Sequence, residues 1–328
     1  MAVLPTLVGL ADVRAVAERI AGHVVRTPTV ASPGLSALLG VPVTAKLELL
    51  QRTGSFKARG ATAKLLSLTA AERAAGVVAV SGGNHGIAVA EMSAALGIDA
   101  AVVMPEAASS ATVAACRATG SDVRLTPDIA AAFALAGELQ AAGRTMVHPF
   151  DDPLVVAAQG TVGLELDEDA PADLTDVLVS IGGGGLASGV AAVLRARRPD
   201  VRVWGVETIG AEAMSAALAA GGPAPVALSS IVSTLSAPSA SRLTYEHVTA
   251  LVTDVLVVPD ADAVRGSLEL AAHAKVWAEP AAGCLVPAAR RVLDRVGPGA
   301  RLGLVICGGN VTRADLERWV ARFGIAPD

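Results

Sequence analysis

The chain of 328 residues is 52% hydrophobic and 17% charged, with a net charge of -5 at pH 7. This length and composition are typical of a folded protein with two domains and exclude a disordered or fibrous chain. Aromatic residues make up only 2%, and lysine and arginine form no basic stripe, so we expect no nucleic-acid partner. Apolar runs such as "AAVVM" and "DVLVSI" are too short to cross a membrane, and the N-terminus lacks the basic start of a signal peptide. We therefore expect a soluble, cytoplasmic protein without a membrane segment.

After a first predicted helix at 12–21, short β-branched runs alternate with longer alanine-rich amphipathic segments. The predicted strands are 43–47, 77–80, 101–104, 123–125, 145–147, 177–181, 201–206, 251–258 and 302–306. The predicted helices between them include 84–96, 109–119, 129–142, 154–166, 186–197, 260–274 and 312–323. This alternation is typical of βαβ units and predicts an α/β fold with parallel sheets flanked by helices.

The predicted strands are too many for one domain of ordinary size, so we expect a split into two. Pro149 and Pro153 interrupt the pattern in "VHPFDDP" at 147–153, which makes this segment the natural boundary. The cysteines at 116, 284 and 307 form no CxxC motif, and the histidines show no HExxH pattern. Neither a disulfide framework nor a zinc site is expected.

Three predicted strand-to-helix junctions carry glycine clusters: "AVSGGNHG" at 79–86, "VSIGGGGLASG" at 179–189 and "VICGGNV" at 305–311. Glycine lets the backbone approach a ligand closely, and the N-terminus of the following helix offers free N–H groups to an anion. Open α/β sheets bind ligands at the carboxyl ends of their strands. One such turn could serve folding alone, but three of them favour a shared ligand site.

A dinucleotide site is the main alternative for the second junction. Gly183 and Gly185 begin a near match to the fingerprint, and Glu207 follows at the end of the next predicted strand. Ser188 stands where the third glycine should be, and the motif lies more than halfway along the chain rather than at its first βα turn. A run of glycines suits a compact phosphate better, because successive backbone N–H groups can surround it.

Six segments occur in the order "ELLQRTGSFKARGA", "SGGNHG", "VHPFDDPLVVAAQGTVGLE", "SIGGGGLASG", "AEPAAG" and "ICGGNV". Their order and spacings resemble those of the fold-type II pyridoxal-phosphate (PLP) enzymes. Within that family the chain is similar to the serine/threonine dehydratase and serine racemase group, from about residue 44 to 313. The resemblance implies two domains of the tryptophan synthase β-like kind, each an open, twisted, mostly parallel sheet flanked by helices. A large PLP-binding domain would comprise 1–70 and 148–328, a small mobile substrate-side domain would comprise 71–147, and the protein would be a homodimer.

The resemblance makes Lys57 of the S-F-K motif the residue that bonds to the cofactor and then removes the substrate Cα proton. Lysine suits both tasks because its pKa falls readily on burial. Phe56 is expected to pack against the pyridine ring. Arg59 and Lys64, in contrast, are expected to be solvated cations of the same helix.

The tetraglycine run Gly182, Gly183, Gly184 and Gly185, with the amide of Leu186, is expected to hold the cofactor phosphate. In this family that phosphate also protonates the leaving hydroxyl, so the cofactor supplies its own general acid.

The segment "SGGNH" resembles the loop that receives the substrate carboxylate, through Ser81, Gly83, Asn84 and His85. Ser81 is also a candidate catalytic residue, and Asn84 is expected near the cofactor 3′-oxygen. For His85 the backbone N–H is a stronger candidate than the imidazole. Glu279 of "AEPAAG" matches a position that lines the active site and is a further candidate for substrate binding.

Cys307 stands where this family commonly has Ser or Thr facing the pyridine nitrogen. A neutral thiol is a weak donor and would leave that nitrogen largely unprotonated, which favours rapid loss of a β-substituent over reversible reprotonation. A thiolate would instead favour the pyridinium form. Both states stay open from the sequence.

Two further departures bear on the activity. Gly82 stands where racemases of this group carry a serine that acts on the face opposite the lysine, so we expect elimination from one face and no racemisation. Glu207 matches one divalent-cation ligand of the metal-dependent members, but Ala213 replaces the expected second carboxylate. Glu212 could substitute for it, or both acids could be ordinary surface residues, so metal dependence stays open.

The sequence therefore predicts a PLP-dependent ammonia-lyase that converts a β-hydroxy amino acid such as threonine or serine to a 2-oxo acid and ammonia. The segment "SSIVSTLSAP" at 229–238 departs from ordinary threonine dehydratases, which keeps 3-hydroxyaspartate and aryl-serines open as substrates. Serine racemase, a nicotinamide-dependent oxidoreductase and a silent PLP-binding protein are the alternatives. Little chain follows the last motif, so no feedback inhibition through a C-terminal regulatory domain is expected.

Overall fold

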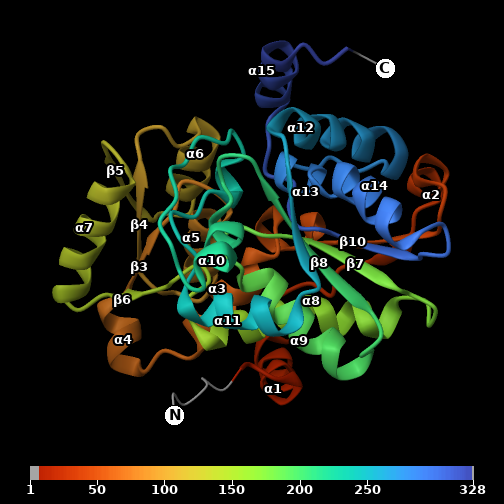
Figure 1. Cartoon of the computed structure of the whole chain (residues 1–328). Coiled ribbons are helices and arrows are strands. Elements are labelled where there is room, and N and C mark those ends of the chain that lie inside the picture. Colours follow the sequence, from red (N-terminus) through yellow and green to blue (C-terminus); the bar gives the residue numbers. More distant parts are fainter. Residues whose placement is uncertain (1–6, 327–328) are drawn as a thin grey trace.

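The computed structural model describes residues 7–326, and they form two sheets that lie side by side with helices packed around them (Figure 1). The predicted α/β fold with two mostly parallel sheets is confirmed. The first six and the last two residues of the expected large domain lie outside the described part of the chain.

The larger sheet has six strands in the order β1-β2-β10-β7-β8-β9. Its strands are β1 (Thr29–Ala31), β2 (Val43–Leu47), β7 (Asp176–Ser180), β8 (Arg202–Thr208), β9 (Asp254–Val258) and β10 (Leu302–Ile306). All neighbours are parallel except β1, which pairs antiparallel with β2. Every residue of β2, β7 and β10 is buried, as expected of central parallel strands that are covered on both faces.

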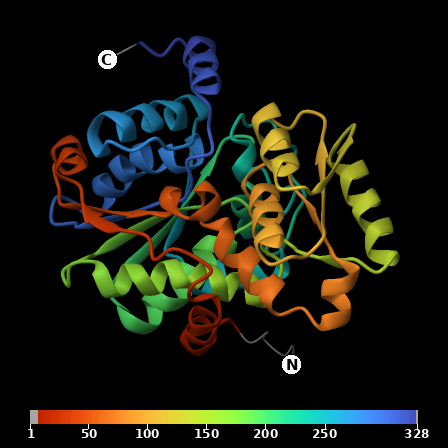
Figure 2. The same cartoon turned by 180° about the vertical axis from the view of Figure 1, so that it is seen from behind.

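Two groups of helices cover this sheet, one on each face (Figures 1 and 2). The first group is α1 (Leu10–Ile20), α8 (Pro153–Asp169), α9 (Gly185–Arg197) and α11 (Arg242–Leu251). The second is α2 (Pro33–Leu39), α12 (Asp260–Glu269), α13 (Pro280–Gly283) and α14 (Leu285–Val296). Pro153 at the start of α8 and the side chain of Asp152, which accepts a bond from the Leu154 amide at 2.9 Å, explain why this helix begins directly after the "VHPFDD" segment.

The smaller sheet is fully parallel, in the order β5-β4-β3-β6. Its strands are β3 (Val77–Val80), β4 (Ala100–Pro105), β5 (Asp122–Thr126) and β6 (Thr145–Met146). One face packs against α3 (Lys57–Leu66), α5 (Asn84–Ala95) and α6 (Ser110–Ala118), and the other against α7 (Ile129–Ala141). The remaining helices include α4 (Ala70–Ala75), α10 (Ala213–Ala220) and α15 (Arg313–Phe323).

Some boundaries differ from the sequence prediction for local reasons. The strand predicted from 251 begins only at Asp254, because α11 extends to Leu251. The helix predicted at 260–274 is α-helical only to Glu269; Leu270–Ala274 forms a π-helical turn that ends at Lys275, whose φ is 61°. The prediction missed β1, α2, α4, α10, α11, α13 and α14. In α14, Pro287 occupies the first turn, where its missing N–H costs no helical hydrogen bond.

No helix within residues 7–326 is long and apolar enough to span a membrane.

Candidate active site

A cavity of about 510 Å³ lies between the two sheets, beside the residues that follow β3, β7 and β10. Its wall includes every residue that the sequence analysis assigned to cofactor or substrate: Phe56, Lys57, Ser81, Gly83, Asn84, His85, Gly182, Gly183, Gly184, Gly185, Leu186, Glu279 and Cys307. Residues far apart in the chain therefore meet at one site, as expected for the carboxyl ends of parallel strands. Glu207 is not part of this wall.

Lys57 is the first residue of α3 and lines this cavity. Nζ donates a hydrogen bond to the carbonyl oxygen of Pro149 at 2.9 Å and lies 5.1 Å from the centre of the Phe56 ring. Burial lowers the pKa of Lys57 to about 8, with the Cys307 thiol acting in the opposite direction. At pH 7, on the order of a tenth of this amine is thus uncharged and can act as a nucleophile or a base.

The segment before Lys57 is fastened to the loop that follows β10. The Phe56 amide donates to the Cys307 carbonyl at 3.1 Å, and Ser55 forms a β-bridge with Gly308. Thr53 has a φ of 69°, a strained value for a β-branched residue, and its carbonyl accepts a bond from Asn310 Nδ2 at 2.8 Å. These contacts fix the position at which α3 starts and thereby the position of Lys57.

The tetraglycine run connects β7 to α9 and forms a tight cradle. Gly184 has a φ of 94°, in the region that favours glycine. A Cβ atom at Gly183 would lie 2.1 Å from the Phe150 ring, and one at Gly182 would lie 2.9 Å from the Leu235 carbonyl oxygen. The first amides of α9 have no carbonyl of their own helix to bond, so this end of the helix can bind an anion.

The "SGGNH" loop follows β3 and begins α5. Ser81 Oγ accepts a hydrogen bond from the Gly83 amide at 3.1 Å. The Asn84 amide group is held from two sides: its Nδ2 donates to Glu279 Oε1 at 2.7 Å, and its Oδ1 accepts from Asn310 Nδ2 at 2.8 Å. Asn84 therefore joins the smaller-sheet side of the cavity to the larger-sheet side.

His85 is buried, and its Nε2 lies 2.7 Å from the Val147 carbonyl oxygen. Burial, together with the charge of Lys57, lowers the pKa of His85 to about 3, so the imidazole is neutral and Nε2–H donates to that carbonyl. With its ring committed to Val147, His85 presents its backbone at the start of α5.

Glu279 caps the site from the larger-sheet side, directly before α13. Its side chain is buried, and burial raises its pKa to about 7, although the bond from Asn84 favours the charged form. Oε2 has no hydrogen-bond partner among residues 7–326. A buried oxygen without a partner is costly in a folded protein, which indicates a polar ligand atom at this point of the wall.

The Cys307 thiol is buried, and its Sγ lies 3.9 Å from Ser180 Oγ. Burial and the neighbouring Glu279 raise the pKa of Cys307 well above its ordinary value. The sequence left both the thiol and the thiolate open, and this raised pKa favours the neutral thiol. At Gly82, an added Cβ would lie 2.9 Å from the Ala108 Cβ, so a side chain there would require the loop or Ala108 to shift.

Two interpretations from the sequence are wrong. Glu207 is fully buried and is no surface residue: its carboxylate accepts bonds from the amides of Met214 (2.7 Å) and Ser215 (2.9 Å) at the start of α10. Within residues 7–326, no group of three or more His, Cys, Asp or Glu side chains is arranged to hold a metal ion.

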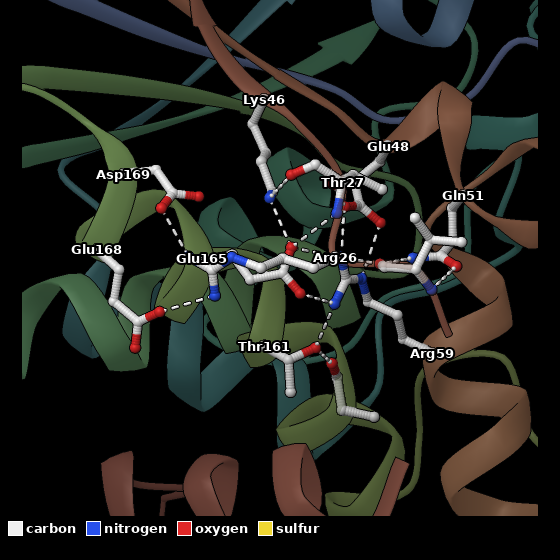
Figure 3. Close-up of polar contacts among 12 residues, drawn as sticks. Arg26, Thr27, Lys46, Glu48, Gln51, Arg59, Thr161, Glu165, Glu168 and Asp169 are labelled. Carbon is white, nitrogen blue, oxygen red and sulfur yellow. Dashed lines mark hydrogen bonds and ion pairs between the residues drawn. The ribbon is translucent and has the colours of Figure 1, made fainter. Parts of the chain in front are cut away.

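Arg59 is the second correction, because it is 1% exposed rather than solvated (Figure 3). Its guanidinium binds two carboxylates with paired hydrogen bonds: Glu48 at 2.8 and 2.7 Å, and Glu165 at 2.6 and 2.8 Å. Lys46 completes the cluster with a 2.6 Å bond to Glu165. Lys64 is partly exposed and paired with Asp152 at 2.8 Å.

The sequence analysis gave no site role to Pro149, Phe150, Ser180 or Asn310, although all four contact residues of the site. The first two belong to "VHPFDDP", which was interpreted as a domain boundary and as part of one of the six family segments, without a role for either residue. Asn310 follows the third glycine junction, and its position after "GG", like that of Asn84, was the available signal.

These groups fit pyridoxal phosphate. A cradle in which added side chains would collide with Phe150 and Leu235, at a helix N-terminus, suits a phosphate. A desolvated amine suits an aldehyde, and the unpaired Glu279 oxygen suits a polar atom of a bound molecule.

The comparisons with known proteins agree. The family described as pyridoxal-phosphate dependent enzyme matches residues 20–308. Phenylserine dehydratase from Ralstonia pickettii is 38% identical over 318 residues, covering 96% of each chain. L-threonine ammonia-lyase from Thermotoga maritima is 37% identical over 95% of this chain and 78% of its own. Maize serine racemase superposes with a TM-score of 0.89 at 30% identity, covering 97% of this chain and 98% of its own. From the site and these likenesses together it follows that the chain belongs to the pyridoxal-phosphate dependent enzymes of fold type II.

Proposed function

We propose that this enzyme is an ammonia-lyase that eliminates the hydroxyl group of a β-hydroxy amino acid and releases a 2-oxo acid and ammonia. The observation that carries the proposal is the placement of the Lys57 amine, with its pKa lowered to about 8, in one cavity with the tetraglycine cradle. The names of the two sequence relatives, a phenylserine dehydratase and an L-threonine ammonia-lyase, support the same reaction class.

Each part of the site has a task in this proposal. Gly182 to Gly185 and the Leu186 amide bind the cofactor phosphate. Phe56, which lies beside Lys57, packs against the pyridine ring of the cofactor. When bound, pyridoxal phosphate supplies an electron sink that stabilises negative charge at the substrate Cα. Lys57 holds the cofactor and, once released by the substrate amine, removes the Cα proton.

The substrate carboxylate is received by the loop of Ser81, Gly83, Asn84 and His85 at the start of α5, where the helix dipole favours an anion. Ser81, the residue that follows β3, lines the same cavity and is a further candidate to bond the substrate. Glu279 orients Asn84 through their 2.7 Å bond and offers its second oxygen to a bound ligand.

Proton transfer occurs on one face of the substrate. Lys57 supplies a base on its own side, whereas Gly82 has no group that can give or take a proton on the other. A neutral Cys307 thiol also favours loss of the β-hydroxyl over reprotonation at Cα. We therefore expect no racemisation of L-serine at a rate that matches elimination.

The test is 2-oxo acid release from purified enzyme with PLP, measured for L-serine, L-threonine, 3-phenylserine and 3-hydroxyaspartate. Release from at least one of them, without D-serine formation at a comparable rate, is the expected result. A nicotinamide-dependent absorbance change in place of 2-oxo acid release would instead support an oxidoreductase. Matching formation of D-serine from L-serine would overturn the role given to Gly82.

The small domain at 71–147, a homodimeric state and a cytoplasmic location are further parts of the proposal, and they rest on the family resemblance. Light scattering after size exclusion tests the assembly: a mass of twice 32.7 kDa is expected. Addition of a chelator tests for a divalent cation, and we expect activity to persist because both oxygens of Glu207 are committed to α10.

A further inference from the structure

Part of the cavity wall is apolar and belongs neither to the glycine cradle nor to the carboxylate loop. Ala107, Ala108, Ile129 and Phe133 supply it from the smaller-sheet side, and Leu228 supplies it from the loop between α10 and the turn at Ser233–Leu235. Neither the phosphate nor the substrate carboxylate needs these side chains. They are therefore available to the remaining part of a substrate, the group attached to Cβ.

Phe133 and Leu228 stand out because they are large apolar side chains exposed to 41% and 38% at a cavity wall. Helix α7 packs on the smaller sheet through Ala132 and Ala136, which are fully buried, so Phe133 is not used for the core. Apolar side chains left open on the wall of a binding cavity gain free energy when an apolar ligand covers them.

The charged side chains of the cavity wall also disfavour an anionic group on the substrate Cβ. Among the described residues that line the cavity, the acidic side chains are Asp151 and Glu279, Lys57 is the lysine, and arginine is absent. His85 is neutral, and burial lowers the pKa of His148 as well. Lys57 is engaged with the cofactor, so a second substrate carboxylate would meet two acids and no free cation. The other polar side chains of the wall are the amide group of Asn84 and the neutral hydroxyls of serine and threonine.

We propose that the enzyme prefers β-hydroxy amino acids with a neutral, apolar group on Cβ, of the aryl-serine class, and that Phe133 and Leu228 contact this group. This inference rests on the proposed function, because it names the substrate class of the same site. It disfavours 3-hydroxyaspartate, whose second carboxylate would be desolvated without a partner.

Binding of amino acids without a β-hydroxyl tests the wall independently of elimination. Calorimetric titration of the PLP-loaded enzyme with L-phenylalanine, L-alanine and L-aspartate compares ligands with a large apolar, a small apolar and an anionic side chain. L-phenylalanine is expected to bind at least about tenfold more tightly than L-alanine, as for burial of an apolar group, and L-aspartate more weakly than L-alanine. L-aspartate binding as tightly as L-phenylalanine would overturn the inference.

Variants assign the effect to the named side chains. Phe133→Ala and Leu228→Ala are each expected to reduce the L-phenylalanine to L-alanine affinity ratio about fivefold or more. Leu125→Ala is the matched control, since Leu125 is 43% exposed on β5 and does not line the cavity; its ratio should not change. If Phe133→Ala does not fold, Phe133→Leu and Leu228→Ala carry the test. An unchanged ratio in the folded Phe133 and Leu228 variants contradicts the assignment.

Kinetics separates a failure of the inference from a failure of the proposed function. The expected order of kcat/KM is 3-phenylserine above L-threonine and L-serine, with 3-hydroxyaspartate lowest. Elimination that is fastest with 3-hydroxyaspartate contradicts the inference and leaves the lyase activity standing. Absence of 2-oxo acid from every substrate, including β-chloro-L-alanine with its better leaving group, contradicts the lyase activity. The order of the calorimetric affinities still shows in that case whether the cavity wall prefers an apolar side chain.

Discussion

Arg59 lies two residues after Lys57 on α3 and connects that helix to the larger-sheet side of the protein. Its paired bonds reach Glu48, directly after β2, and Glu165 on α8, so one side chain joins three elements (Figure 3). Burial opposes a charge at Glu165, yet the bonds and charges of Arg59 and Lys46 outweigh it and hold the pKa of Glu165 below its ordinary value. The cluster has two cations and two anions and is balanced only when all four are present.

Replacing Arg59 with methionine should therefore destabilise the protein strongly. The change leaves Glu48 and Glu165 buried without their main partner, and such losses cost about 3–5 kcal/mol of unfolding free energy. Urea unfolding measures the effect, with Arg14→Met as the control, since Arg14 is an exposed arginine of α1. Equal unfolding free energies for the two variants would show that the cluster does not stabilise the fold.

Glu279 should make the stability of the cofactor-free protein depend on pH. Its pKa is about 7 when folded, against an ordinary value of 4.5, because burial disfavours the charged form. Between these values the folded state holds a proton that the unfolded state releases, so stability falls as pH rises through this window. Relative to Glu279→Gln, the wild type should lose up to about 3 kcal/mol between pH 4.5 and 7.5. Urea unfolding of both proteins across this pH range measures the loss. A difference in unfolding free energy that does not change with pH would contradict the raised pKa of Glu279.

At the scale of elements, the junction of β7 and α9 tolerates only glycine where it faces Phe150. Gly183→Ala places a Cβ 2.1 Å from that ring, so we expect PLP affinity to fall at least about tenfold and stability by about 1–3 kcal/mol. Gly222→Ala is the control, since nothing lies within 4 Å of its added Cβ. Titration with PLP followed by absorbance measures the affinity. Phe150→Ala should partly rescue Gly183→Ala, and a Gly183→Ala protein with unchanged affinity would show that the cradle does not bind the phosphate.

The regular βαβ elements could be predicted from the sequence because each carries its own pattern. The buried strands are nearly continuous apolar runs, and Asp152, Asp128 and Thr312 cap the helices that follow them. The short strand β1 could not, since it exists only by pairing with β2 at the sheet edge. Helix α11, which Ser241 caps, was also missed, and its last residue, Leu251, was assigned to the strand that follows it.

The site was predictable to the extent that it depends on motifs. Lys57, the glycine run and the "SGGNH" loop were found because their order along the chain resembles a known family. Arg59 was misjudged because its partners Glu48 and Glu165 come from other elements, and no local pattern brings them together. The wall residues Phe133 and Leu228 carry no motif, and only folding places them beside the same cavity.

At the scale of the whole molecule, the cavity depends on both sheets, and Asn84 links them through Glu279 and Asn310. If the small domain at 71–147 moves to enclose substrate, its helices α5 to α7 should become more protected when a ligand binds. Hydrogen exchange with and without L-phenylalanine measures this, with α14 of the larger unit as the reference. If ligand binding changed the protection of α14 as much as that of these helices, a separate motion of the small domain would be contradicted.

Lys57 alone is expected to hold the cofactor, and because the chain has four lysines this role can be tested directly. Lys46 is buried in its pair with Glu165, Lys64 is paired with Asp152, and Lys275 bonds the Ala272 carbonyl near its own turn. Only Lys57 lines the cavity. Borohydride reduction of the PLP-loaded enzyme, followed by peptide mass spectrometry, should find the pyridoxyl adduct at Lys57 and lose it in Lys57→Ala. An adduct at any other lysine, or none at all, would contradict the account.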